Sequence, residues 1–379
     1  MSDYRILALS CSLFISTSLG ASATVVCPAD ALPKPDAREA LDNPDLHAWK
    51  LFIAVSRPAD LTKGRGIPDS QKKIGDPGKV VWETWKLART EVYKDDGSDP
   101  GDWNTVIDQS VKIVDPPKSA VVFGGLVPKG DKPKILFDPK ETTNETRMNC
   151  ETFKFVVDNE LFNIEGQENF MTSSIGSGKL MRFPNESVEV KAFWREFSTS
   201  EANGDLPKRY YTYKESNGKL WGLATLHIIT KEIPNWFWTS FRQKDGPPPR
   251  FPKGDGAGMP SELIGTVWEN YELSGSQIDF VDTIGRSIIL SDPLIEAGFE
   301  KSSCMTCHAN AGIRNIVNGR RDEMPFAYGL DVDGELRTPL GSPIANLFLE
   351  NFGNQGADQS VYQQDFVFSL RRAKNKSPR

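Results

Sequence analysis

Side chains that can ligate a metal or act as nucleophiles are scarce in this sequence. Only three histidines and five cysteines occur among its 379 residues, which leaves few positions for a metal centre or a thiol-based active site. Beyond the first 23 residues, no apolar run is long enough to cross a membrane as a helix. Positive charge is not in excess either, since the formal net charge is −6. This argues against a nucleic-acid partner, which usually requires a basic face.

The N-terminal residues are typical of an export signal. A short start containing Arg5 precedes an apolar stretch, and Ala21-Ser22-Ala23 then matches the small-x-small pattern of a signal peptidase site. We therefore expect residues 1–23 to be a signal peptide that is cleaved after Ala23, so that the mature protein is periplasmic or secreted. The alternative is a buried N-terminal helix. Asp3 weakens the export interpretation, because a purely positive start is usual.

The five cysteines divide into three groups. Cys11 is expected to leave with the signal peptide, and Cys304 and Cys307 belong to a motif discussed below. The remaining two, Cys27 and Cys150, are an even number. The compartment that the export signal predicts is oxidising, so cysteines can pair there. We therefore predict a disulfide between them.

Alternating apolar and polar side chains predict antiparallel strands in the middle of the chain. Within Glu186–Trp194, three apolar residues fall on one face, while Glu189 and Lys191 fall on the other. Tyr210–Lys214 and Leu220–Thr230 flank an Asn-Gly pair, which is a strong signal for a hairpin turn. Strands joined by hairpins are antiparallel, so the expected fold class is α+β.

The remaining segments suggest how the chain is organised. Asp45–Val55 has apolar side chains at helical spacing and should form a helix after a leading loop at 24–45. Residues 244–261 are rich in Gly, Pro and Asp, and are the best candidate for a boundary. We expect a β-rich domain at 24–243 and a mostly helical segment at 262–379. The helices expected in that segment are Ile278–Leu290, Pro293–Phe299 and Pro343–Phe352.

One short motif carries most of the chemical information. Cys304, two further residues, Cys307 and His308 form C-x-x-C-H, the signature for covalent attachment of a c-type haem. Two thiols three positions apart on a helical turn point to the same side and can bond to both vinyl groups of the macrocycle. The adjacent imidazole then reaches the iron as the proximal ligand. With this composition the motif arises by chance in about 5 of 10,000 sequences, so we predict one covalent haem c in the segment 262–379.

Two other interpretations of the paired cysteines have less support. A thioredoxin-like redox site needs a βαβ context, whereas the strands here are of the hairpin type. A zinc site needs a second pair of ligands, and the sequence has no other C-x-x-C and no H-x-x-H.

The sixth position of the haem iron has several candidate ligands. Met324 precedes a proline downstream of the motif, as in many small cytochromes c, although only about sixteen residues separate it from His308. His227 lies in an apolar strand, where a lone histidine is more often a hydrogen-bonded core residue than a ligand. Met259 is a third option, and His47 has the least support. We keep His227 and Met324 as the candidate sixth ligands.

The ligand at this position bears on the function. A methionine sulfur raises the reduction potential, a second histidine lowers it, and an open position permits chemistry on small molecules. The first hypothesis is an exported electron carrier that serves a redox partner protein. The alternative is a haem enzyme or small-molecule sensor whose pocket is formed by the β-rich domain. No constellation typical of a catalytic site is visible in the sequence.

Several stretches together resemble a poorly characterised family of bacterial single-haem cytochrome c proteins. They are 49–54, 82–85, 188–194, 222–229, 236–241, 303–308 and 365–370. The resemblance covers most of the mature chain, although only the haem motif is specific by itself. It implies a large β-rich N-terminal region joined to a C-terminal haem segment. It also implies some role for His227, because the Leu-His-Ile stretch recurs in the family.

Overall fold

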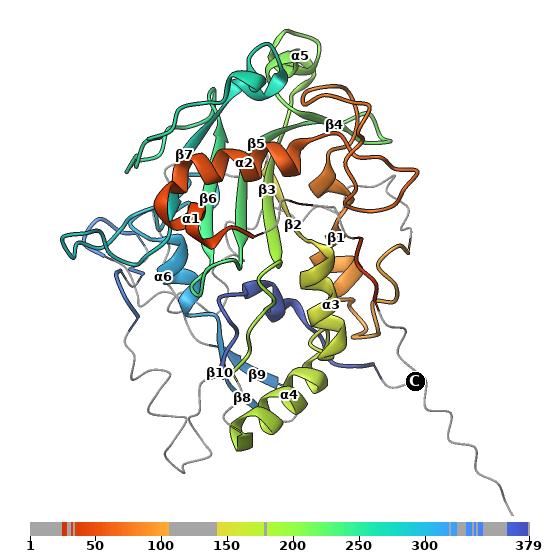
Figure 1. The fold of residues 1–379 in the computed structure, drawn as a ribbon, viewed down its shortest axis with the longest axis vertical. Helices are drawn as coiled ribbons and strands as arrows, with labels where there is room; N and C mark the ends of the chain where they lie inside the picture. The colour runs from red at the N-terminus through yellow and green to blue at the C-terminus, as the bar shows by residue number, and fades with distance from the viewer. Residues whose placement is uncertain are drawn as a thin grey trace, which may run out of the picture.

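An antiparallel sheet forms the centre of the molecule (Figure 1). The computed structural model describes residues 25–28, 32, 35–105, 142–177, 180–317, 320–323, 331–335, 337–338, 340–343 and 362–377. Within them the sheet has seven strands in the order β1-β2-β3-β5-β6-β7, with β4 beside the start of β5. The strands are β1 (Lys86–Leu87), β2 (Thr142–Met148), β3 (Val188–Glu196), β4 (Thr212–Lys214), β5 (Leu220–Thr230), β6 (Phe237–Gln243) and β7 (Tyr271–Gln277). The α+β class, the strand near 186–194 and the hairpin are confirmed.

The two faces of the sheet differ in chemistry, as the alternation in β3 predicts. Lys191 of β3 lies directly opposite His227 of β5, and Glu189 lies opposite Ile229. Successive side chains of a strand point to opposite faces, so these four share one face, while Val190 and Ile228 share the other. Helix α2 (Pro44–Ser56) covers the apolar face.

Helix α2 lies across the apolar face, in front of β5 and β6 in Figure 1. It begins with Pro44, whose fixed φ and missing N–H suit the first turn of a helix. Its Trp49 and Phe52 rings lie 4.9 and 4.3 Å from the ring of Phe241 in β6. Each buried aromatic pair of this kind contributes about 0.5–1.5 kcal/mol beyond the area it buries.

The segment predicted as a leading loop at 24–45 contains a short helix, and this expectation is corrected. Helix α1 (Ala37–Asp42) begins where the side chain of Asp36 accepts a hydrogen bond from the backbone N–H of Glu39. Further helices in the described part are α3 (Cys150–Asp158), α4 (Ile164–Ser177) and α5 (Thr199–Ala202). A helix of only six residues is too short to show a clear apolar periodicity in the sequence.

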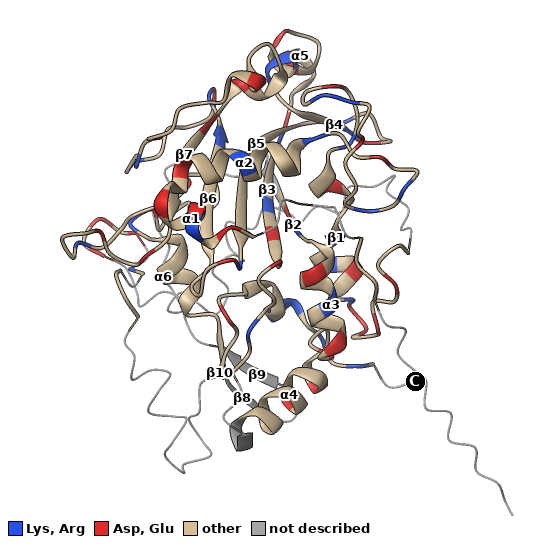
Figure 2. Cartoon of the chain, viewed as in Figure 1, with Lys and Arg blue, Asp and Glu red and all other residues tan. Residues whose placement is uncertain are grey.

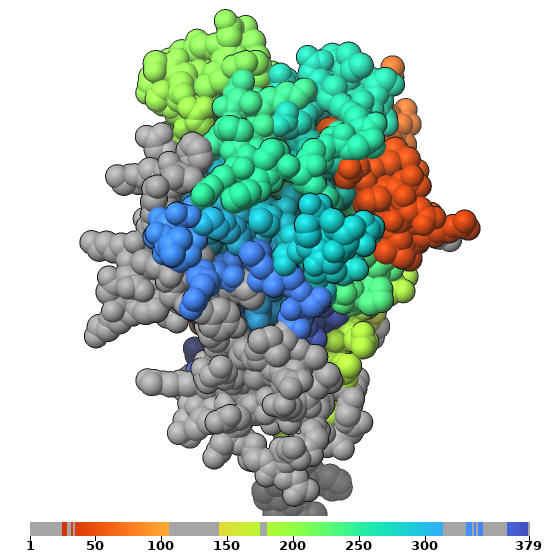
Figure 3. Space-filling view, turned by 90° about the vertical axis from the view of Figure 1, so that its left-hand side faces the viewer, coloured from red at the N-terminus to blue at the C-terminus, as the bar shows by residue number. Residues whose placement is uncertain are grey.

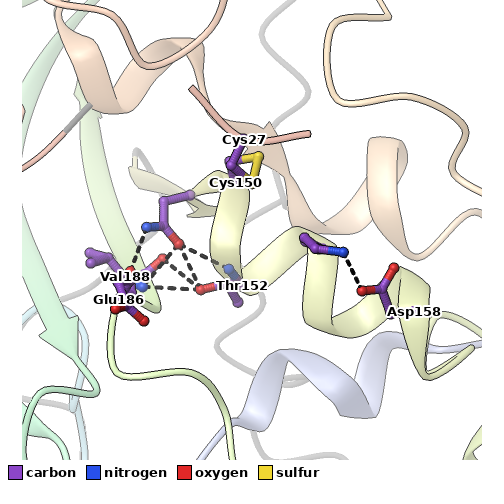
Figure 4. Close-up of a disulfide and its surroundings, with 8 residues drawn as sticks. Cys27, Cys150, Thr152, Asp158, Glu186 and Val188 are labelled. Atoms are coloured by element: carbon purple, nitrogen blue, oxygen red, sulfur yellow. Dashed lines mark hydrogen bonds and ion pairs between the residues drawn. A yellow bond between two sulfur atoms is a disulfide. The ribbon is translucent and has the colours of Figure 1, made fainter. Parts of the chain in front are cut away.

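The predicted disulfide between Cys27 and Cys150 is confirmed (Figure 4). The two Cα atoms are 5.5 Å apart, and 123 positions separate the residues in sequence. Cys150 is the first residue of α3, whose N-cap Asn149 accepts hydrogen bonds from Thr152 and Val188. The bond therefore ties the start of the described chain to a helix anchored on β3.

The sheet continues beyond the loop at 244–261. Strand β7 follows that loop and pairs with β6, from Trp238 opposite Gln277 to Gln243 opposite Tyr271. The first residues of the segment expected at 262–379 thus supply an edge strand of the main sheet. Later parts of the segment form a second, three-stranded sheet: β8 (Gly312–Val317), β9 (Arg320–Glu323) and β10 (Tyr362–Gln363).

Helices are not the dominant structure among the described residues of this segment, and that expectation is corrected. Helix α6 (Cys304–Ala309) and the 3-10 helix η7 (Phe368–Arg372) occur, but 278–290 and 293–299 are turns and irregular chain. The side chains of Asp282 and Asp292 explain this, since each accepts hydrogen bonds from backbone N–H groups two or more positions later. Such turns compete with a helix.

Several sequence predictions lie outside the described residues. These are the signal peptide at 1–23 and the helix predicted at Pro343–Phe352, of which only the first residue is described. Where the structure is described, it contains no helix with the length and apolarity needed to cross a membrane.

Candidate functional site

The C-x-x-C-H motif lies on helix α6, which is held in place by β7. Ser303 caps the helix by accepting a hydrogen bond from the N–H of Thr306. The side chain of Gln277, the last residue of β7, donates to the Ser303 hydroxyl at 2.5 Å and accepts from the N–H of Met305 at 3.1 Å. The position of the motif is therefore fixed relative to the main sheet.

Segments that follow the motif pack on it from outside. The Thr306 hydroxyl donates to the carbonyl of Gly341 at 2.8 Å, and the Lys301 ammonium lies 2.9 Å from the Asp331 carboxylate. Figure 3 shows blue residues of this C-terminal part packed against the cyan residues that follow β7. Residues that precede the motif in the sequence and residues that follow it thus both pack against it.

Cys304, Cys307 and His308 all line one cavity of about 290 Å³. Both thiols are free, and Cys307 is only 8% exposed. Cys304 donates a hydrogen bond to the carbonyl of Leu290 at 3.3 Å. The geometry places two thiols and one imidazole on the same wall of a single cavity, as the motif predicts.

The imidazole of His308 is oriented by the backbone of the C-terminal segment. Its Nδ1–H donates to the carbonyl oxygen of Phe366 at 2.8 Å, because a carbonyl can only accept. This selects the tautomer whose Nε2 carries a lone pair. The rings of Trp238 and Phe368 lie 4.5 and 4.8 Å from the imidazole and fix its plane. Burial lowers the pKa of His308 to about 4, which keeps the ring neutral, as a metal ligand must be.

The carbonyl of Phe366 reaches His308 because the backbone adopts an unfavourable conformation. Asp365 and Phe366 have φ values of 45° and 68°, in the left-handed region that a bulky residue rarely enters. Asp365 is held there by Lys231, whose ammonium lies 2.7 Å from its carboxylate, and by the N–H of Phe183. Backbone strain of this kind persists only where the surroundings enforce it.

We expect Lys231→Met to destabilise the protein by about 3–5 kcal/mol, because a buried carboxylate loses its counter-charge. The side chains of Lys231 and Asp365 are only 4% and 5% exposed. Burial lowers the pKa of Lys231 and raises that of Asp365, so both charged forms depend on the pair. Denaturant unfolding at pH 7 measures the loss.

The matched control for this prediction is Lys154→Met. Lys154 forms an ion pair with Asp158 within α3, but the two side chains are 31% and 43% exposed (Figure 4). Its removal should cost about 0.5 kcal/mol or less. Equal losses in the two variants would show that the Lys231 pair does not hold the turn.

The polar face of the main sheet also lines the cavity. Six side chains from three neighbouring strands and β2 contribute to it: Thr146, Glu189, Lys191, His227, Ile229 and Trp238. His227 thus faces the same cavity as the C-x-x-C-H motif. Its buried Nε2 has no hydrogen-bond partner among the residues that the structure describes. Burial, together with Lys191 and His308, lowers the pKa of His227 to about 3.

Two of the other candidate ligands, Met259 and His47, do not line this cavity. Met324 lies outside the described residues. Met259 is in the loop between β6 and β7 and does not line the cavity. His47 is on α2, at the other face of the sheet, where its Nε2 is 2.6 Å from the carboxylate of Glu232. Burial opposes the charged form of His47, but its carboxylate neighbours prevail and raise its pKa.

Sequence reasoning missed the charged residues of the cavity, although it placed Glu189 and Lys191 on the polar face of β3. Both kinds of charge occur in the middle of that strand (Figure 2). Glu296 and two arginines of η7, Arg371 and Arg372, join them at the cavity. Burial raises the pKa of Glu189 to about 7 and that of Glu296 to about 8. No pattern in the sequence links 189–191 with 296 and 371–372.

The geometry does not support a thioredoxin-like redox site or a zinc site at the paired cysteines. Burial raises the pKa of the Cys307 thiol to about 12, whereas an attacking thiol of the thioredoxin type has a lowered pKa. Across the described ranges, no three His, Cys, Asp or Glu side chains are grouped so that they could hold a metal ion.

Relatives do not add to the evidence for this site. No protein-family model, curated protein or solved structure matches the chain. The resemblance to single-haem cytochrome c proteins therefore stays a prediction. What can be argued about function depends on the residues of the cavity.

Proposed function

We propose that the chain is an exported c-type cytochrome that binds one haem through Cys304 and Cys307, with His308 as proximal ligand. A single observation carries the proposal: both thiols open into the same cavity as an imidazole whose Nδ1 is already bonded to the carbonyl of Phe366. Free thiols near a neutral ring nitrogen are the groups that a c-type haem needs. When bound, the haem supplies one-electron chemistry, and the first candidate activity is electron transfer to a redox partner protein.

His227 is the residue that would hold the haem iron together with His308. It lines the same cavity as the motif, and its Nε2 has no hydrogen-bond partner within the described part of the chain. A buried, neutral imidazole with an unsatisfied nitrogen is costly unless something else engages it. In this proposal the main sheet positions His227, and Phe366 positions His308. Two histidine ligands favour a low reduction potential.

A haem enzyme or small-molecule sensor is the second candidate, and the charged side chains of the cavity favour it. Glu189, Lys191 and Glu296 line the same cavity as the motif. A pure electron carrier has no evident need for buried ionisable groups, which cost free energy to keep there. If a small molecule binds in this cavity, these residues would contact it.

The visible spectrum of the purified ferrous protein, with and without CO, separates the two candidates. If His227 occupies the axial position, CO should cause little change in the native protein, and His227→Ala should convert it into a form that responds strongly. The matched control is Met259→Leu, outside the cavity, which should leave both spectra unchanged. A strong CO response in the native protein would contradict ligation by His227 and support the second candidate. An unchanged spectrum in His227→Ala would exclude this residue.

A further inference from the structure

Among the described residues, Lys191 lines the cavity without a hydrogen-bond or ion-pair partner. Where the structure is described, no carboxylate or carbonyl lies within hydrogen-bond or ion-pair distance of its ammonium group. Lys191 is half-buried at this cavity, where its charge is less well solvated than on the open surface. Burial accordingly lowers the pKa of Lys191, and Glu296 only partly opposes the shift. An incoming anion would satisfy this group.

The acidic residues of the cavity are engaged with other groups. An oxygen of Glu296 accepts a hydrogen bond from the N–H of Asp292 at 2.6 Å. Glu189 accepts one from the Ser369 hydroxyl at 2.7 Å, and it is attracted to Arg372. Burial and Asp292 raise the pKa of Glu296 and so favour its neutral form, while the charge of Lys191 opposes the shift. Neither carboxylate forms a hydrogen bond or an ion pair with Lys191, although Glu296 attracts its charge.

The groups around Lys191 also favour negative charge. Arg371 and Arg372 line the same cavity, so both the sheet and η7 contribute positively charged side chains to it. His227 lies directly opposite Lys191 on the neighbouring strand, where side chains are about 5 Å apart. A neutral imidazole can donate a hydrogen bond to an anion held there. The cavity therefore offers an ammonium group and a ring N–H side by side.

We propose that Lys191 is the centre of an anion-binding site, which takes one carboxylate or a small oxyanion beside His227. Two sources fit this chemistry. One is a carboxylate of the haem itself, and here the inference rests on the proposed function. The other is a free anion that enters the cavity, which would be a ligand or substrate of the second candidate function.

The test compares the native protein with Lys191→Met, Lys191→Arg and the control Lys214→Met, which removes an exposed lysine of β4. Intact mass first records whether haem is attached. Thermal unfolding is then followed with increasing sodium formate, at an ionic strength held constant with gluconate. Equilibrium redox titration of the haem-loaded forms gives the reduction potential.

If the anion is free, formate raises the melting temperature of the native protein, and Lys191→Met weakens the apparent affinity for formate at least tenfold. Lys191→Met should also melt higher than the native protein without formate, because it lacks the unpaired cation. If the anion is a haem carboxylate, formate has no effect, and Lys191→Met lowers both the melting temperature and the reduction potential. Lys191→Arg and Lys214→Met should resemble the native protein in either case.

The proposal is overturned if Lys191→Met matches the native protein in its formate response, melting temperature and reduction potential. Absence of haem from the intact mass is a separate result. It would reject the proposed function and the haem carboxylate as the anion. The formate titration would then decide the anion site by itself, and a formate response that does not depend on Lys191 would reject it.

Discussion

Replacing Cys304 and Cys307 together by alanine is expected to abolish covalent haem attachment completely. The two thioether bonds are the only covalent links that the motif provides, and the proximal histidine alone binds haem reversibly. In a host able to mature cytochromes, the native protein should carry the added mass of one macrocycle after denaturation. The double variant should lack it. Intact mass spectrometry under denaturing conditions is the measurement.

The matched control removes the other cysteine pair. Cys27 and Cys150 are joined to each other far from the motif in sequence, so a variant with alanine at both positions should retain covalent haem. Far-ultraviolet circular dichroism of all forms shows whether the fold survives. Native protein that emerges without the added mass would refute the proposed function, whatever the variants do.

Removing the disulfide with Cys27→Ser and Cys150→Ser should lower the free energy of unfolding by about 4–5 kcal/mol. The bond closes a loop spanning 123 positions, and the entropy lost by the unfolded chain grows with loop length. Native-state strain would reduce this value. Denaturant titration of the variant and of the native protein gives the difference.

Chemical reduction of the native protein provides the control for that measurement. Reduced and alkylated native protein should lose as much stability as the double serine variant, because each opens the same loop. Non-reducing peptide mapping should find Cys27 linked to Cys150 in the starting material. Equal stability of the oxidised and reduced forms would contradict the expected contribution of the bond.

The sequence predicts those features that depend on short-range patterns or on simple counting. Alternation of side chains identifies β3, the Asn-Gly pair identifies the turn between β4 and β5, and helical spacing identifies α2. The hypothesis of a disulfide comes from counting the cysteines and from the expectation that the chain is exported. The motif is recognisable because its five positions are contiguous, and α6 gives them the helical geometry that the chemistry requires.

Tertiary contacts determine the parts that the sequence does not predict. Asp282 and Asp292 favour turns in two stretches whose apolar spacing is helical. Their side chains accept hydrogen bonds from backbone N–H groups, and these local bonds compete with a helix. The cavity brings together a strand near 190, a turn near 296 and η7. These segments are far apart in sequence and share no periodicity. Charge on the polar face of β3 would ordinarily indicate a solvated surface, and only the packing of η7 and α6 shows that it is enclosed.

Phe366 illustrates a contact that no local rule anticipates. Its carbonyl orients His308, yet the residue itself is apolar, and nothing in its type suggests a role at the site. The left-handed backbone at 365–366 would normally be expected at glycine or asparagine. The ion pair of Asp365 with Lys231 makes that conformation possible, and it links two segments 134 positions apart.

Burial of the motif constrains when a macrocycle can be joined to it. In the folded chain Cys307 is almost inaccessible. Residues near the C-terminus form hydrogen bonds with the segment that carries the motif. The backbone N–H of Gln364 donates to the carbonyl of Ala311, and the carbonyl of Phe366 accepts from His308. A rigid porphyrin cannot pass between tightly packed backbone segments. If Cys304 and Cys307 bind haem as proposed, the thioether bonds would therefore form before the C-terminal residues dock.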